Sequence, residues 1–275
     1  MKLIKIIKEE WKKLILILLP VLLCIIIYFT PRSFQEIFVL NLNNLNYWSW
    51  FTYIFLHENL AHISMNMLIY VLAIVSAYIL TPKEDKKTFV WILYFAIVLI
   101  PLITLLLIIY LRNIRLFPIN LINSRGFSGI SAGALGILGY AISKVIYLSS
   151  KGNKSITRLL YATYYIFLPS LAVMALNLNY FFSIGIGVLW LVIVALWTIL
   201  SITHAKKNKI KLKENPLYIK HLIIPMLILL IGVFLMSPKN LAANGSLVNT
   251  PAHLFGFLIG WALSFIINRT FSKRL

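Results

Sequence analysis

Residues 89–111 read FVWILYFAIVLIPLITLLLIIYL, a run of 23 residues without a charged side chain. The hydrocarbon core of a bilayer is about 30 Å thick, and a helix of about 20 apolar residues crosses it. The whole chain has this character, because 61% of its 275 residues are hydrophobic and 12% are charged. Soluble domains are about half apolar and a quarter charged, so the composition excludes a soluble globular protein. We predict an all-α, polytopic membrane protein.

Seven further apolar segments are long enough to cross a bilayer, which gives eight predicted transmembrane helices. The eight spans are 14–29, 51–80, 89–111, 127–149, 159–176, 181–203, 222–237 and 251–268. The loops between them are too short to bury a core of their own, so we expect no attached soluble domain. The first span is too long for a cleaved signal peptide and is interpreted as an uncleaved signal anchor.

The cationic residues are distributed unevenly between the loops. The chain has 26 Lys+Arg and 7 Asp+Glu, a formal net charge of +19. Nucleic-acid binding is disfavoured, because these cations lie in short tracts between apolar runs and not on a soluble surface. Twenty of them lie in the segments 1–13, 81–88, 150–158, 204–221 and 269–275. The positive-inside rule therefore predicts a multi-pass protein of the cell membrane with both termini in the cytoplasm.

This topology divides the chain into three parts. Residues 1–13 are the expected cytoplasmic basic N-terminus, residues 14–268 the membrane domain, and residues 269–275 a cytoplasmic basic tail. The single cysteine, Cys24, lies inside the first apolar run, so no disulfide is expected.

Polar residues within the span 51–80 are candidates for function, because ionisable groups are costly in a bilayer. His62 and Asn66 are four residues apart and share one face of a helix, whereas His57 would lie about 140° round the helix from His62. The string His57-Glu-x-x-x-His62 is one residue too long for the zinc motif His-Glu-x-x-His, so we expect no metal. The only aspartate, Asp85, lies in a predicted cytoplasmic loop, which excludes an aspartyl intramembrane protease.

The span 127–149 opens with Gly126-Phe-Ser128-Gly129, a serine flanked by glycines. Three interpretations are open: a packing face with an incidental hydroxyl, a nucleophile, and an anion site at the helix N-terminus. Glycines let a substrate backbone approach closely, and the N–H groups of a helix N-terminus stabilise a developing oxyanion. An anion site would lack a cationic partner inside the helix.

Two faces of small residues connect this serine to a histidine in the last span. One is on the span 127–149 and the other on the span 251–268; together they comprise Gly129, Gly133, Gly136, His253, Gly256 and Gly260. Faces of small residues pack closely in lipid, which would place Ser128 beside His253. With no carboxylate nearby apart from Glu58 at the mouth, the sequence predicts a Ser–His dyad. The side chains of His62 and Asn66 and the Ser128 backbone N–H are the expected oxyanion donors.

Taken together, these motifs resemble those of the rhomboid intramembrane serine proteases. The motifs are His57-x4-His62-x3-Asn66, Gly126-x-Ser128-Gly129 with two further glycines, and Ala252-His253-x2-Gly256-x3-Gly260. The resemblance implies a six-helix core that cleaves transmembrane substrates within or near the outer end of their span, without cofactor or metal. It implies that Ser128 is the nucleophile, His253 the base, and His62 with Asn66 the oxyanion hole.

The same resemblance implies roles for other residues around the site. His57, Gly126 and Gly129 would line an outward-open cavity, with His57 helping to hydrate it. Four glycines would pack the helices: Gly133, Gly136, Gly256 and Gly260.

This sequence departs from the family pattern at several positions. Tyr53 replaces a frequent histidine, and Trp48-Ser49 stands where a Trp-Arg pair is expected. An aromatic residue that stacks on the catalytic imidazole is replaced by Ala132, so something else must hold His253. Two extra spans, 159–203, are interpreted as an inserted hairpin, whose even number of helices keeps His253 on the outer side.

Two other classes of protein compete with a protease. A catalytically inactive relative would bind membrane clients without cleaving them, but it typically lacks the serine or the histidine. A transporter or channel would place polar pairs near the middle of the membrane, whereas these polar groups gather at the outer edge.

Overall fold

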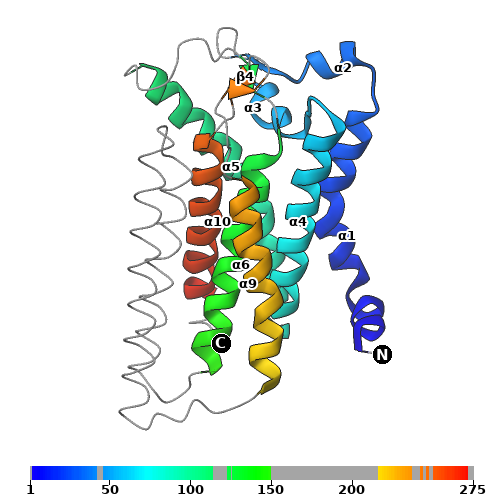
Figure 1. Cartoon of the computed structure of the whole chain (residues 1–275), viewed down its shortest axis with the longest axis vertical. Coiled ribbons are helices and arrows are strands. Elements are labelled where there is room, and N and C mark those ends of the chain that lie inside the picture. The colour runs from blue at the N-terminus through cyan, green and yellow to red at the C-terminus, as the bar shows by residue number, and fades with distance from the viewer. Residues whose placement is uncertain are drawn as a thin grey trace.

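The computed structural model describes residues 2–41, 46–113, 123–124, 126–149, 216–236, 242–243, 246–247 and 250–271. Within these residues, six long helices lie side by side along the long axis of the molecule (Figure 1). They are α1 (Lys2–Tyr28), α4 (Leu60–Leu80), α5 (Lys86–Asn113), α6 (Ser128–Ser149), α9 (Pro216–Met236) and α10 (Thr250–Phe271). The predicted spans 159–176 and 181–203 lie outside the described residues.

Three described helical stretches are long and apolar enough to cross a membrane: Glu10–Tyr28, Leu60–Leu80 and Lys83–Leu107. Shorter apolar stretches, Ile224–Val233 and Phe255–Ile267, lie in α9 and α10. The chain is therefore a mostly helical membrane protein.

Short elements connect the long helices. They are α2 (Arg32–Glu36), β1 (Leu40–Asn41), α3 (Ser49–Thr52), the 3-10 helices η1 (Tyr53–Phe55) and η2 (Lys83–Asp85), β2 (Asn123–Ser124), β3 (Ala242–Ala243) and β4 (Ser246–Leu247). β1 pairs antiparallel with β2, and β3 pairs antiparallel with β4. The labelled elements α2, α3 and β4 gather at one end of the bundle, and the marked N and C ends lie toward the other end (Figure 1).

The second predicted span is interrupted. The sequence predicted one helix over 51–80, but α3 ends at Thr52, η1 ends at Phe55, Leu56 is extended, and α4 begins only at Leu60. Asn59 caps α4, since its side chain accepts a hydrogen bond of 2.8 Å from the backbone N–H of His62. The prediction that His57 lies on the same helix as His62 was therefore wrong.

α6 lies in the middle of the bundle and packs against α4, α5, α9 and α10. Its closest neighbour is α10, because glycines face backbone on both helices. A Cβ added at Gly256 would collide with the carbonyl oxygen of Gly129, and one added at Gly260 with that of Gly133. These two helices therefore approach to backbone contact, as small residues allow in membranes.

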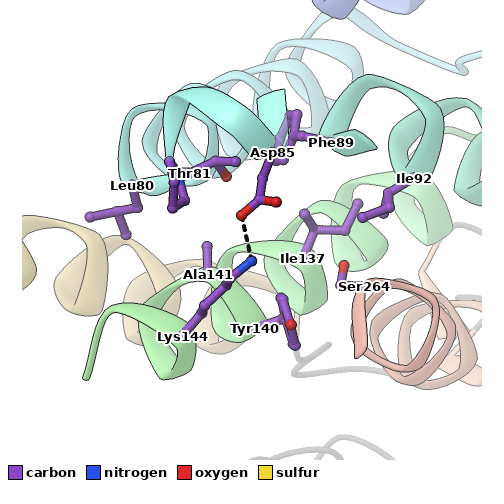
Figure 2. Close-up of a pocket in the computed structure, with 11 residues that line it drawn as sticks. Leu80, Thr81, Asp85, Phe89, Ile92, Ile137, Tyr140, Ala141, Lys144 and Ser264 are labelled. Carbon is purple, nitrogen blue, oxygen red and sulfur yellow. Dashed lines mark hydrogen bonds and ion pairs between the residues drawn. The ribbon is translucent and has the colours of Figure 1, made fainter. Parts of the chain in front are cut away.

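Polar contacts fasten the opposite end of the bundle. Figure 2 shows the Asp85 carboxylate, in η2, pointing toward the Lys144 ammonium group of α6, and the two form an ion pair of 2.6 Å. This pair borders a cavity of about 20 Å³, enough for a single water molecule. The α4–α5 connection is thereby tied to the end of α6 that lies away from Ser128.

Candidate active site

Ser128 is the first residue of α6 and is buried. The turn before it depends on Gly126, whose backbone φ of +123° is rarely adopted by residues other than glycine. The Gly126 N–H donates a hydrogen bond of 3.1 Å to the carbonyl oxygen of Tyr53. Strand β2, just upstream, pairs with β1 from the first loop. The segment that presents Ser128 is therefore held from two sides.

His253 lies in the first turn of α10 and is buried. Its Nδ1 atom is 2.7 Å from the carbonyl oxygen of Met236, the last residue of α9. A carbonyl oxygen only accepts hydrogen bonds, so Nδ1 carries the proton of the neutral ring. Nε2 is then free of a proton, which is the state that a general base requires. The Met236 carbonyl thus orients His253, a role that a carboxylate or a stacked aromatic ring would otherwise fill.

The packing of α6 against α10 brings Ser128 and His253 to the same end of one interface. A Cβ added at Gly129, next to Ser128, would lie 3.2 Å from the carbonyl oxygen of Ala252, next to His253. The described side chains of Ser128 and His253 do not hydrogen-bond directly to each other. Catalytic hydrogen bonds are often long in a free enzyme and shorten when substrate binds.

His62 and Asn66 reach the same place from α4. A Cβ at Gly126 would lie 3.3 Å from Cε1 of His62 and 4.0 Å from Oγ of Ser128, so the His62 ring borders the turn that carries the serine. Asn66 is buried one turn further along α4. The backbone carbonyl oxygen of Asn66 accepts a hydrogen bond of 2.9 Å from the Ser131 hydroxyl of α6. This bond fixes α4 against the helix that begins at Ser128.

His57 lies behind these residues, in the break before α4, with 1% of its surface exposed. Its Nε2 atom is 3.2 Å from Nδ2 of Asn66 and 3.5 Å from the backbone nitrogen of Phe127. Its ring meets the ring of His62 edge-on, with the centroids 5.2 Å apart. His57 is therefore in contact with two candidate oxyanion donors and with the segment before Ser128.

A small cavity of about 10 Å³ adjoins Ser128. Among its lining residues are Gly126, Gly129, Tyr53 and Thr104. The Thr104 hydroxyl of α5 is buried and has no hydrogen-bond partner among the described residues. Sequence reasoning missed Thr104, although it is the only hydroxyl of the aliphatic run 95–109 and a lone polar group in such a run is itself a signal.

Within the part of the chain that the structure describes, His, Cys, Asp and Glu side chains do not gather in groups of three or more that could hold a metal ion. The candidate site thus consists of one hydroxyl, imidazole rings, one carboxamide and backbone N–H groups. Such a set suits acyl transfer, with a nucleophile, a base and hydrogen-bond donors for an oxyanion.

A family model, the Rhomboid domain, matches residues 44–207, which is more than half of the chain. No curated protein and no solved structure matches the chain. The matched region contains His57, His62, Asn66 and Ser128 and runs through the segment 159–203. His253 lies beyond its end. On this match, and with its bundle of apolar helices, the chain belongs to the rhomboid family.

Proposed function

We propose that this protein is an intramembrane serine endopeptidase, with Ser128 as nucleophile and His253 as general base. Rhomboid proteins are generally proteases of this kind, and the family match supports the class. The observation that carries the proposal for this chain is the contact of 2.7 Å between His253 Nδ1 and the Met236 carbonyl oxygen. It assigns the ring proton to Nδ1 and leaves Nε2 to accept a proton.

The chemistry proceeds through an acyl-enzyme. The Ser128 oxygen attacks the scissile carbonyl while its proton passes to His253 Nε2, and His253 then gives this proton to the leaving amine. A water molecule, deprotonated by the same nitrogen, releases the acyl group. The Met236 carbonyl keeps its hydrogen bond with Nδ1–H throughout and so stabilises the imidazolium that forms.

The oxyanion is stabilised by donors from two helices. The Ser128 backbone N–H lies at the N-terminus of α6, where N–H groups lack helical partners and the helix dipole is positive. His62 and Asn66 supply side-chain donors from α4, and His62 borders the turn at Gly126. Preorganised donors of this kind are usually the largest contribution to catalysis.

The substrates are membrane proteins, cut near the outer end of a transmembrane segment. Ser128 begins α6, whereas Lys144, near the other end of α6, pairs with Asp85 of the cation-rich loop 81–88. The excess of cations at the termini and alternate loops supports cytoplasmic termini in the cell membrane. The two inferences together put the dyad toward the outer surface.

A fluorophosphonate probe tests the proposal directly, because it reacts only with an activated serine. Purified wild-type protein should be labelled on Ser128 and should cleave a model single-span client, whereas Ser128→Ala should do neither. Wild-type protein that is neither labelled nor active would instead be an inactive relative that binds clients without cleaving them.

A further inference from the structure

The buried histidine His57 has no part in the mechanism above, yet two donors converge on one of its nitrogens. Asn66 Nδ2 lies 3.2 Å from His57 Nε2, and the Phe127 backbone nitrogen lies 3.5 Å from it. One of these partners is a candidate oxyanion donor, and the other is the residue immediately before Ser128.

The Phe127 N–H determines which atoms donate and which accept at His57 Nε2. A backbone N–H only donates, so His57 Nε2 is an acceptor and the proton of the neutral ring is on Nδ1. The atom of Asn66 that faces Nε2 must then be its NH₂ group and not its carbonyl oxygen. This fixes which way the carboxamide is turned, a choice that the carboxamide alone leaves open.

On the basis of this geometry, we propose that His57 is a positioning residue that orients the Asn66 carboxamide and the backbone before Ser128 for oxyanion binding. The Asn66 NH₂ group has two hydrogens, and His57 accepts one of them, which leaves the other for the oxyanion. This inference rests on the proposed function, because it assigns a role within the same reaction.

The break in the chain before α4 supports this role. Leu56 is extended and α4 begins at Leu60, so His57 stands outside the helix and turns toward Asn66, nine residues later. In a continuous helix, residues nine apart are two and a half turns apart, and their side chains point to opposite faces. The interruption is therefore what brings His57 to Asn66.

The segment 53–57 also binds the amide that precedes Phe127. The Gly126 N–H donates to the Tyr53 carbonyl oxygen, and the Phe127 N–H points at His57. Two consecutive amides before Ser128 are thus bound by residues 53–57. A catalytic constellation of this kind works only when a supporting shell keeps it within a fraction of an ångström of its productive geometry.

The test compares two substitutions of similar length that differ in the acceptor. His57→Gln keeps a strong acceptor near the position of Nε2, whereas the thioether of His57→Met accepts only weakly. Turnover of a model single-span client is measured as kcat and KM for both variants and for wild-type protein. Loss of a whole oxyanion donor lowers turnover about 10²–10³-fold, so misorientation by His57→Met should lower kcat about 10- to 100-fold, with little change in KM. His57→Gln should recover most of that loss.

A merely structural role for His57 would give a different result. Thermal unfolding shows whether both variants are folded. If they are, equal kcat values for His57→Gln and His57→Met would overturn the inference. If His57→Met does not fold, His57→Leu provides the same comparison without an acceptor.

A double-mutant cycle with Asn66→Ala supplies the second readout. If His57 acts through Asn66, His57→Met should lower kcat by a smaller factor in the Asn66→Ala background than in wild-type protein. Independent, multiplicative losses would overturn the inference. Failure of the proposed function is distinguishable, since it would appear as wild-type protein that the fluorophosphonate probe does not label.

Discussion

At the scale of single residues, the candidate chemistry depends on a hydroxyl and an imidazole whose proton is placed by a backbone carbonyl. His253 has no carboxylate partner in the described site; Met236 offers its carbonyl oxygen at 2.7 Å. A neutral acceptor stabilises an imidazolium less than an aspartate does, because it carries no full charge. In the proposed mechanism, the dyad would therefore rely on its oxyanion donors for much of its rate.

Removing either member of the dyad should abolish cleavage. We expect Ser128→Ala and His253→Ala each to eliminate turnover of a single-span client, and the double variant to be no worse, because the two residues act as a unit. Ser143→Ala is the matched control, since Ser143 is a buried serine on the same helix whose hydroxyl, among the described residues, bonds to the Gly139 carbonyl of its own helix. Cleavage near the wild-type rate in Ser128→Ala or His253→Ala would contradict the assignment.

Substitution of the proposed oxyanion donors should lower client turnover more than it lowers labelling of Ser128 by the fluorophosphonate probe. We expect His62→Ala and Asn66→Ala to lower kcat by about 10²–10³-fold, because each removes one donor from the transition state. Labelling of Ser128 by the fluorophosphonate probe should be partly spared, since nucleophile and base remain. Unchanged kcat in both variants would mean that these residues are packed polar groups without a catalytic role.

Motifs and spacing predicted which residue types form the candidate site, but not how they are held. Ser128, His253, His62 and Asn66 were named from sequence, and the resemblance to the rhomboid family is confirmed. The Met236 carbonyl was not foreseen, because every residue has a carbonyl and spacing does not distinguish one from another. The contact of His57 with Asn66 was missed for another reason: it needs a break in a segment that reads as one helix.

At the scale of elements, the interface between α6 and α10 sets the distance between Ser128 and His253, the proposed nucleophile and base. At three of its glycines, Gly136, Gly256 and Gly260, an added Cβ would collide with a backbone carbonyl oxygen of the partner helix, so these positions leave no room for a methyl group. Gly232 of α9 is different, because a Cβ there would meet the side chain of Leu135 at 2.6 Å, and a leucine side chain is able to move. The two kinds of glycine should therefore respond differently to alanine.

Gly260→Ala should reduce both stability and activity, because its methyl group would press on the Gly133 carbonyl oxygen. Overpacking of this kind typically costs about 1–3 kcal/mol, and the displaced helix would also shift His253 from Ser128. Thermal unfolding and client turnover measure the two effects. Gly232→Ala is the matched control and should be nearly neutral in both measurements. Equal effects of the two substitutions would show that backbone contact between α6 and α10 does not matter.

Hydropathy predicted the long helices well and the short elements poorly. Six of the predicted spans coincide with long described helices, because an apolar run of this length has few other conformations in lipid. The break at 56–59 was missed since apolar residues continue through Phe55 and Leu56, and only the cap residue Asn59 marks the start of α4. Two-residue strands such as β1 and β2 carry no periodic signal.

At the scale of the whole molecule, the two ends of the bundle have different contacts. The end of the bundle that holds η2 is fastened by ion pairs, Lys144 with Asp85 and Lys86 with Glu10, the second at 3.6 Å. The other end carries the candidate dyad, beside short elements and a small cavity. The position of the candidate dyad at one end of the bundle bears on how a membrane substrate reaches it.

A stable substrate helix is a poor client for such a site. Its amides are already hydrogen-bonded within the helix, and in a bilayer those bonds are costly to break. Clients should therefore carry Gly, Pro or polar residues near the outer end of their span, with small side chains beside the scissile bond. We propose entry between α4 and α9, which are neighbours in the bundle; α9 also has exposed apolar side chains, such as Ile231 and Leu235.

Replacing the helix-breaking residues of a client with leucine should then block cleavage. Gly or Pro near the scissile bond lowers the cost of unwinding the client helix, whereas leucine is a strong helix former and removes that advantage. Cleavage of the two clients by the same protein in proteoliposomes measures the effect, and a client with leucines placed only at the cytoplasmic end of its span is the control. If the leucine-filled client is cut as fast as the original, local unwinding is not required. The dyad would then act on extended chain just outside the membrane, where no helix has to open.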